Sequence, residues 1–461
     1  MRSEASTFAV IDELGAALGE RLVVDPDVLD AHRRDQASWG LAGSPVGLVR
    51  ARTTAHVQST VRVCARLGIP IVPRGAGSGL SGGANAVDGG VVLALDGMSR
   101  IVDVLEDEQL AVVEPGVINL DLKTAVSELG LWYPPDPASQ AFSTLGGNIA
   151  TNAGGLCCLK YGVTRDWVVS LEVVLADGSV IVTRAPTRKD VAGYDLTGLI
   201  VGSEGTLGIV TRAVVRLRPK PPPASTLVAF FPSLVSAGNA ITAICRAVTP
   251  SLLELLDRAT IAAVDDWTGM GLDRDTDALL LAQTDADTPQ QQREELAAIE
   301  RACRDIGATY CASTEDPDEG NLLLNARRLA YPALERLGAT LLDDVALPRQ
   351  RVAHYLAIVD EIRARHDVRI FTFGHAGDGN LHPTLVYDAF DQEERGRVQR
   401  AFDDLLREAI DMGGSITGEH GVGNLKAAHL PSQLGPDRLR VHRAIKAALD
   451  PANLLNPGKF L

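Results

Sequence analysis

Two histidines in the segment FTFGHAGDGNLHPTLVY, residues 371–387, have a spacing that could bind a metal ion. If Asp378 and Gly379 form the two-residue turn that an Asp-Gly pair favours, His375 lies directly opposite His382 on one face of a hairpin. Directly opposed residues have Cβ atoms ~5 Å apart, and two imidazoles at that separation can converge on one cation at ~2.0–2.1 Å. The same pattern also fits a half-buried hairpin without a metal, so the hairpin alone leaves both interpretations open.

The hairpin belongs to a long acidic chain. Of its 461 residues, 46% are hydrophobic and 22% are charged, and the formal net charge is -15. This length is typical of two or three domains, and the negative charge argues against nucleic acid or an anionic membrane as a partner. The first twenty residues resemble an amphipathic helix rather than a signal peptide. No run approaches the ~20 apolar residues of a transmembrane segment. We therefore expect a soluble, cytoplasmic protein with a small-molecule ligand.

The six cysteines show no C-x-x-C spacing, which argues against an iron–sulfur cluster or a zinc knuckle. The Pro-rich stretch RPKPPPAS, residues 218–225, separates a glycine-rich region from longer helical patterns and marks a domain boundary. Before this boundary, Gly77, Gly79 and Gly82 match G-x-G-x-x-G, but the strand-like VVLAL follows where a Rossmann fold needs a helix. We expect this backbone to bind phosphate without a Rossmann fold.

Several segments resemble the FAD-binding domain of the vanillyl-alcohol oxidase and p-cresol methylhydroxylase superfamily, namely VPRGAGSGLSGG, PPDPASQAFSTLGGNIATNAGG, YGVTRDWVVSLEVVLADGS and GSEGTLGIVTRAVVRLRPKP. The motifs GHAGDGNLHP, TGEHGVGNLK and LDPANLLNPGKF narrow the resemblance to D-lactate, glycolate and D-2-hydroxyglutarate dehydrogenases. It implies an α+β fold with a p-cresol methylhydroxylase-type FAD-binding domain of two α+β subdomains and a C-terminal α+β substrate or cap domain. The expected ranges are an N-terminal helical lead-in at 1–45, the FAD-binding domain at 46–222, the substrate and metal-binding domain at 223–455 and a segment returning to the flavin at 456–461.

The resemblance implies FAD as the cofactor. Its diphosphate is a dianion, which backbone amides in glycine-rich loops can bind without many lysines. PRGAGSGLSGG contains no histidine for covalent attachment, so we expect non-covalent FAD. The implied FAD-binding residues are Pro73, Arg74, Gly75, Ala76, Gly77, Ser78, Gly79, Leu80, Ser81, Pro135, Asp136, Ser139, Gly146, Gly147, Asn148, Ala150, Thr151, Asn152, Gly154, Gly155, Glu204, Gly205, Ile209 and Asn456.

The resemblance also supplies a third metal ligand, Glu419, beside His375 and His382. Two imidazoles and a carboxylate leave open positions on a divalent ion, for which we expect zinc. The ion would bind the substrate and lower the pKa of its hydroxyl, as it does for bound water. His420 is implied as the catalytic base, removing the hydroxyl proton while the Cα hydride passes to the flavin N5.

An arginine is the natural partner for the substrate carboxylate because its fork matches the anion bidentately. Relatives carry this arginine at the position of Arg327, although Arg328 beside it fits the pattern as well. Leu342 replaces the lysine and Thr384 replaces the asparagine of D-2-hydroxyglutarate enzymes. We therefore expect oxidation of a smaller acid, D-lactate or glycolate, to the 2-oxo acid, with D-2-hydroxyglutarate as the less favoured substrate.

Three alternatives remain open from the sequence. The enzyme could be an oxygen-using 2-hydroxy-acid oxidase, or a non-haem iron oxygenase, since two histidines and a carboxylate also bind non-haem iron. A non-enzymatic subunit is disfavoured by the intact Glu419 and His420. Because the chain has no iron–sulfur pattern, its electrons must pass to an external acceptor, whose identity is open. The oligomeric state is open too, with a homodimer as one option.

Overall fold

The computed structural model describes residues 4–460, which form two compact units. Unit 1 contains Met1–Gly154, Val163–Lys220 and Glu419–Leu461, and unit 2 contains Gly155–Gly162 and Pro221–Gly418. The boundary after residue 220 falls within the predicted Pro-rich joint. The compact units differ from the predicted ranges at the C-terminus, because the residues from 419 onwards group with unit 1 rather than with the preceding C-terminal segment.

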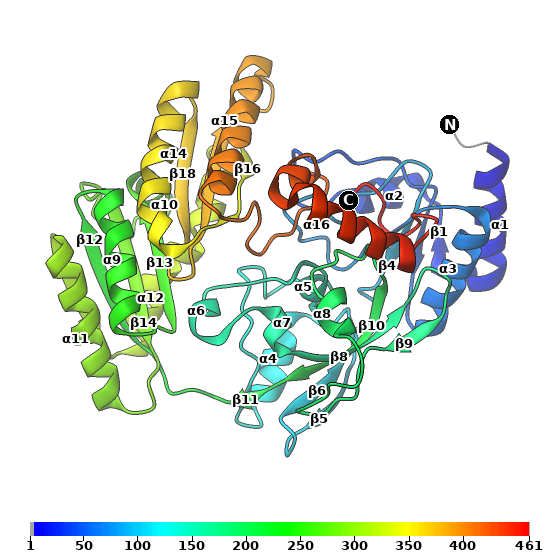
Figure 1. Ribbon diagram of the computed structural model, residues 1–461, viewed down its shortest axis with the longest axis horizontal. Helices are drawn as coiled ribbons and strands as arrows, with labels where there is room; N and C mark the ends of the chain where they lie inside the picture. Colours follow the sequence, from blue (N-terminus) through cyan, green and yellow to red (C-terminus); the bar gives the residue numbers. More distant parts are fainter. Residues whose placement is uncertain (1–3, 461) are drawn as a thin grey trace. The chain divides into compact units, whose positions relative to one another are not determined.

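The first sheet of unit 1 has four strands in the order β1-β2-β4-β3. Two of them, β1 and β4, are labelled in Figure 1. Its strands are β1 (Leu22–Val23), β2 (Gly47–Arg50), β3 (Ile71–Arg74) and β4 (Val91–Ala94). The helix α3 (Thr54–Leu67) joins the parallel strands β2 and β3. It begins after Thr53, whose side chain accepts a hydrogen bond from the backbone of His56, and it ends at Gly68 in the left-handed conformation. Valines on its inner face pack into the core under this sheet, with α1 (Glu4–Leu18) alongside.

Residues 75–90, between β3 and β4, form turns and bends and contain no helix. The first four residues of the VVLAL run form β4, as predicted, and all four are buried. The G-x-G-x-x-G match therefore lies in a loop between two strands rather than at a helix N-terminus, which agrees with the expectation that it is not a Rossmann fingerprint.

The second sheet of unit 1 is antiparallel, with five strands in the order β5-β6-β10-β8-β9, and has a separate core. Its strands are β5 (Ile101–Leu105), β6 (Leu110–Val113), β8 (Val168–Val174), β9 (Val180–Val182) and β10 (Ile209–Arg216). The remaining elements are α2 (Pro26–His32), α4 (Asn119–Ser127), β7 (Leu131–Trp132), α5 (Leu145–Thr151), α7 (Thr164–Trp167), α8 (Leu196–Ile200), β11 (Arg218–Pro219) and α16 (Leu430–Leu449). These two larger sheets, each packed against its own core, correspond to the two α+β subdomains that the resemblance implied.

Unit 2 is built on an antiparallel sheet in the order β15-β12-β14-β13-β18-β19-β16, with β17 also paired to β19. The strands are β12 (Ser225–Phe231), β13 (Leu252–Asp257), β14 (Ala278–Thr284), β15 (Tyr310–Thr314), β16 (Ala339–Leu342), β17 (Val345–Ala346), β18 (Arg369–His375) and β19 (Asn380–Tyr387). The helices are α6 (Cys158–Tyr161), α9 (Leu234–Ala247), α10 (Arg258–Thr268), α11 (Pro289–Ile306), α12 (Pro317–Arg328), α13 (Ala330–Glu335), α14 (Val352–His366) and α15 (Gln392–Asp411). The central strands β13, β18 and β19 are almost wholly buried. Polar side chains on these strands are therefore shielded from water, and they form part of the site described below.

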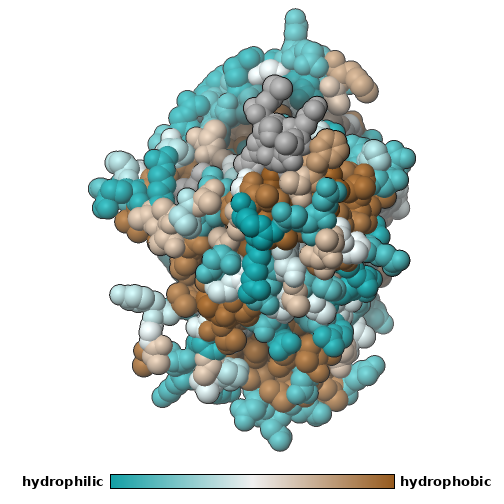
Figure 2. Space-filling model, turned by 90° about the vertical axis from the view of Figure 1, so that its right-hand side faces the viewer, coloured by the Kyte–Doolittle hydropathy of each residue, from teal (hydrophilic) through white to brown (hydrophobic). Residues whose placement is uncertain are grey.

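The molecular surface combines hydrophilic side chains with scattered apolar ones. On the face drawn in Figure 2, hydrophobic patches lie among hydrophilic residues. Within residues 4–460, no helix combines the length and apolar character needed to cross a membrane.

Candidate active site

The predicted hairpin exists, but its register differs from the prediction. The strands β18 and β19 are joined by the four residues 376–379, and His375 lies opposite Asn380 rather than His382. The backbone N–H of Gly377 donates to the carbonyl of Leu253 on β13, 3.0 Å away. Because Gly377 pairs with this third strand, it cannot pair with Asn380, and the two-residue turn does not form. The prediction considered the hairpin alone and missed this competing partner.

The two imidazoles nevertheless lie close together. His382 is opposite Phe373, so His375 and His382 are diagonal neighbours on one face of the sheet. Their ring centroids are 5.3 Å apart and their planes are almost perpendicular, at 87°. Both side chains are buried. The predicted proximity of the two histidines is therefore present, although it arises across a diagonal.

A buried glutamate orients His375. Glu254, on β13, is fully shielded from solvent, and its Oε1 lies 2.8 Å from Nδ1 of His375. Its Oε2 accepts a hydrogen bond from Nε of Arg327 at 2.5 Å. Arg327 is itself buried, whereas Arg328 is exposed, so Arg327 is the member of the arginine pair that reaches Glu254.

A second buried acid lies beside His382. Oδ1 of Asp344 is 3.8 Å from Nδ1 of His382 and accepts a hydrogen bond from the Asn380 side chain at 2.8 Å. Oδ2 of Asp344 accepts bonds from the hydroxyl of Thr417 and the backbone N–H of Gly418. Asp344 therefore holds the end of the loop that leads directly to Glu419.

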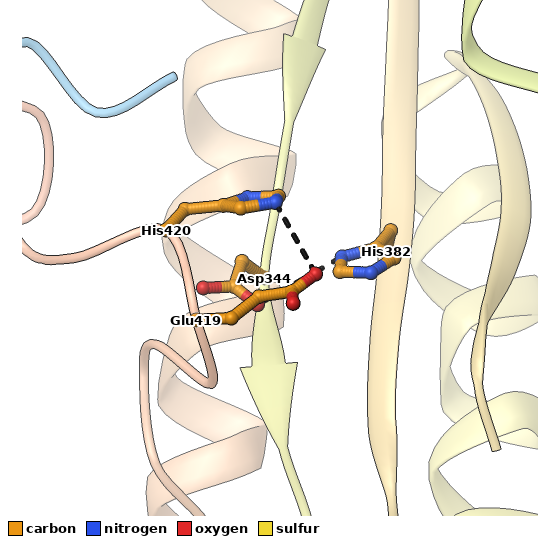
Figure 3. Close-up of side chains that lie close together, drawn as sticks. All are labelled: Asp344, His382, Glu419 and His420. Atoms are coloured by element: carbon orange, nitrogen blue, oxygen red, sulfur yellow. Dashed lines mark ion pairs between the residues drawn. The ribbon is translucent and has the colours of Figure 1, made fainter. Parts of the chain in front are cut away.

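Glu419 and His420 follow Gly418 in the chain, and Nε2 of His420 lies 3.5 Å from Oε1 of Glu419. Figure 3 shows these two side chains together with Asp344 and His382. Unit 2 supplies one imidazole and one carboxylate of this group, and unit 1 supplies the other pair. Imidazoles and carboxylates are ligands that divalent ions accept in proteins. His375, which was predicted as a ligand, is not one of these four.

Within unit 1, Glu204 anchors the loop that follows His420. Its carboxylate oxygens accept hydrogen bonds from the backbone N–H groups of Val422 and Gly423 at 2.7 and 2.8 Å. The loop also contacts the glycine-rich segment, because the N–H of Leu425 donates to the carbonyl of Ser81 at 3.1 Å. Glu204 was predicted to bind FAD, and in the structure its carboxylate holds this loop.

Burial of Glu204 raises its pKa from 4.5 to about 7, although the two amide hydrogen bonds act in the opposite direction. Between these pH values the folded state keeps a proton that the unfolded chain has lost, so this group's contribution to stability falls as the pH rises through that window. Each pH unit there costs at most ~1.4 kcal/mol. The glutamine of Glu204→Gln cannot ionise, so the variant lacks this pH-dependent loss. The melting temperature of the variant minus that of the wild type should therefore be more positive at pH 8 than at pH 5. A pH-independent difference in melting temperature would contradict this expectation.

Backbone contacts join the predicted FAD-binding segments that lie in unit 1. The N–H of Glu204 donates to the carbonyl of Ala150, and the N–H of Asn456 donates to the carbonyl of Ile71, both at 2.8 Å. The Asn456 side chain donates to the carbonyls of Gly83 and Glu204 at 2.9 and 2.8 Å. The glycine-rich loop, α5, the segment at 204–205 and the C-terminus are thereby brought together.

Two observations in unit 1 fit a bound FAD. A Cβ on Gly75 would stand 2.3 Å from Oγ1 of Thr144, so the loop and the start of α5 approach as closely as glycine allows. Nη1 of Arg74 and Oδ1 of Asn456 are buried without a hydrogen-bond partner. Unsatisfied buried polar groups are costly, and a phosphate-bearing cofactor with a polar ring system offers the acceptors and donors that they lack.

Other predicted FAD-binding residues have structural roles in the described chain. Asn152 ends α5 in the left-handed conformation, and its Oδ1 accepts a hydrogen bond from the N–H of Arg165. Oδ1 of Asn148 accepts one from the Asn119 side chain, and Ile209 lies in the core of unit 1. Gly155 belongs to unit 2. These side chains shape the segments around the candidate flavin site.

Glu254 and Asp344 were missed by sequence reasoning. Each is an acidic residue in or beside an apolar strand, within SLLELLD and TLLDDVALP. A charged residue in a strand that is otherwise hydrophobic is rarely buried without a partner, and this signal could have marked both.

Comparison with known proteins identifies the family. Residues 220–460 match the family model described as "FAD linked oxidases, C-terminal domain", and residues 45–184 match the "FAD binding domain" model. The chain belongs to the FAD-linked oxidase family. The chain is 44% identical to the glycolate oxidase subunit GlcD of Bacillus subtilis (strain 168), over 90% of this chain and 89% of that protein. It is 34% identical to the D-lactate dehydrogenase of Archaeoglobus fulgidus, over 90% and 91% of the two chains.

Solved structures confirm the predicted fold. The FAD-linked oxidase matches p-cresol methylhydroxylase with substrate bound at a TM-score of 0.83 and 20% identity, covering 99% of this chain and 97% of the other. It matches the 4-ethylphenol oxidase of Gulosibacter chungangensis at a TM-score of 0.82 and 21% identity, with the same coverage. The p-cresol methylhydroxylase-type α+β architecture is therefore correct.

Proposed function

We propose that this FAD-linked oxidase converts a D-2-hydroxy acid, with D-lactate or glycolate favoured, to the 2-oxo acid. The observation that carries the proposal is the pairing, inside unit 2, of a buried guanidinium with two imidazoles: Arg327 and His375 share the carboxylate of Glu254, and His382 lies beside His375. An anion-binding group next to metal-binding or proton-accepting groups suits a substrate with a carboxylate and an adjacent hydroxyl. Relatives named glycolate oxidase subunit and D-lactate dehydrogenase support the same substrate class.

Arg327 would bind the substrate carboxylate. Its Nε is held by Glu254, and its guanidinium carbon lies 4.8 Å from the centre of the Phe373 ring. These contacts fix the plane of the fork and leave its two terminal nitrogens to form a bidentate pair with an anion. Burial excludes water and strengthens this ion pair.

His420 would accept the proton of the substrate hydroxyl. Its Nε2 lies 3.5 Å from Oε1 of the neighbouring Glu419. Zinc or a similar ion held by His382, Glu419 and neighbouring ligands, with His375 as a further candidate, would lower the pKa of that hydroxyl. FAD bound in the loops of unit 1 would supply the acceptor for the hydride from the substrate α-carbon.

The side chains of Leu342 and Thr384 favour a small acid. They are directly opposed on β16 and β19, and both are buried. Neither carries a charge that could compensate a second carboxylate, and burying an uncompensated carboxylate is strongly unfavourable. D-2-hydroxyglutarate is therefore a less favoured substrate than D-lactate or glycolate.

Anaerobic mixing with matched D and L acids tests the proposal. We expect D-lactate, and glycolate, which has no enantiomers, to bleach the oxidised flavin, and L-lactate to leave it yellow, because a fixed carboxylate clamp and a fixed base present one α-hydrogen to the flavin. Equal bleaching rates with both lactates would refute the stereochemical part, and no bleaching with any 2-hydroxy acid would refute the substrate class. Admitting oxygen after reduction then distinguishes an oxidase from a dehydrogenase that needs another acceptor.

A further inference from the structure

One buried carboxylate, that of Glu254, holds two functional groups at once. Oε1 contacts the ring of His375 at 2.8 Å, and Oε2 contacts Nε of Arg327 at 2.5 Å. The three side chains come from β13, β18 and the last turn of α12, all within unit 2.

The position of Glu254 follows from the sheet. Leu255 pairs with Gly374 across β13 and β18, which places Glu254 beside His375 at the edge of that ladder. Its side chain is 0% exposed. An isolated buried carboxylate is strongly unfavourable, so both partners are needed to keep it in the sheet.

The contact also determines which nitrogen of His375 can bind a ligand. An ionised carboxylate accepts hydrogen bonds and cannot donate them, so Nδ1 must carry the hydrogen. In the neutral ring this leaves the lone pair on Nε2. A carboxylate on the far nitrogen of a metal-binding histidine is a recurrent arrangement that fixes the ring and raises its basicity.

We propose that Glu254 is a positioning residue that serves two sites together: it prepares His375 for a divalent ion and Arg327 for the substrate carboxylate. The inference rests on the proposed function. It adds that the metal affinity and the substrate affinity depend on the same buried side chain, which touches neither ligand.

The test uses Glu254→Gln in the flavin-loaded protein. A glutamine side chain offers one acceptor and one donor group, so it can accept from His375 or from Arg327 but not from both. We expect zinc affinity, measured by chelator competition without turnover, to fall about 10–100-fold. We expect KM for D-lactate to rise about tenfold, because an oriented charge-assisted pair is lost. The flavin content should be unchanged.

Asp257→Asn is the matched control. Asp257 lies on the same strand, is also buried, and accepts hydrogen bonds from the backbone of Thr260 and Thr372, with Arg363 nearby. Its carboxylate is thus engaged by Thr260, Thr372 and Arg363, whereas that of Glu254 is engaged by His375 and Arg327. Its replacement removes a buried charge from β13 and should lower the melting temperature without a selective loss of zinc or substrate affinity.

The outcomes separate this inference from the proposed function. Unchanged zinc affinity and unchanged KM in folded Glu254→Gln would overturn the positioning role, and so would equal losses in Asp257→Asn. If the wild type binds no zinc, the metal part of the proposed function is refuted, and so is the claim that Glu254 prepares His375 for an ion. The change in KM for D-lactate would then test the remaining claim, that Glu254 positions Arg327. If Glu254→Gln does not fold, Glu254→Asp keeps the charge but is too short to reach both partners, and it should show the same two losses.

Discussion

Replacing His382 with alanine should abolish most of the turnover and most of the bound metal while FAD remains in unit 1. His382 is buried and belongs to the group of four potential ligands, and losing an ion that activates the hydroxyl should reduce the rate by several orders of magnitude. Metal analysis beside anaerobic flavin reduction measures both effects. A His382→Ala enzyme that keeps its metal and near-normal turnover would end the metal hypothesis.

The double variant tests whether His375 belongs to the same functional unit. Groups that act together lose nearly everything with the first deletion, so His375→Ala, His382→Ala and the double variant should have similar residual rates. If His375 lies outside the metal site, its single variant should keep more metal than His382→Ala. His354→Ala, on the exposed side of α14, is the control and should keep both metal and rate.

Replacing His420 with alanine should lower turnover by ~10²–10⁴-fold, the usual contribution of a general base. The metal should remain bound, because His382, Glu419 and Asp344 would still offer three ligands.

Loss of metal together with turnover would show instead that His420 is a ligand rather than the base. His442→Ala is the control, since His442 lies on α16 in the same unit and contacts the Phe460 ring. It should retain the rate, the metal and the pH profile of the wild type. A rate loss of the same size in this control would remove the case for a specific role of His420.

The family and fold could be predicted from the sequence because their signals are local. Glycine-rich loops, the Pro-rich joint and the short runs around Glu419 and His420 are contiguous, and each needs only its own residues to be recognised. His375 and His382 share one face, as predicted, because the actual register differs from the predicted one by two residues, and a shift of two keeps each side chain on its face.

What could not be predicted depends on partners far away in the chain. The hairpin register was wrong because Leu253, on another strand, takes the hydrogen bond from Gly377. Glu204 meets Val422 across 218 positions, and Glu254 meets His375 across 121. No periodicity in one segment contains that information, so buried acids were the residues most easily overlooked.

The division of the chain limits how its units can be exchanged. The backbone passes between the units four times, after residues 154, 162, 220 and 418. A chimera that replaces everything after the Pro-rich joint would give unit 1 an α16 from the other protein. It would also replace the loop at Val422 and Gly423 whose backbone N–H groups donate to Glu204. A substrate-specificity graft between relatives must instead carry two pieces, 155–162 and 221–418, and leave the tail from Glu419 onwards with its original host.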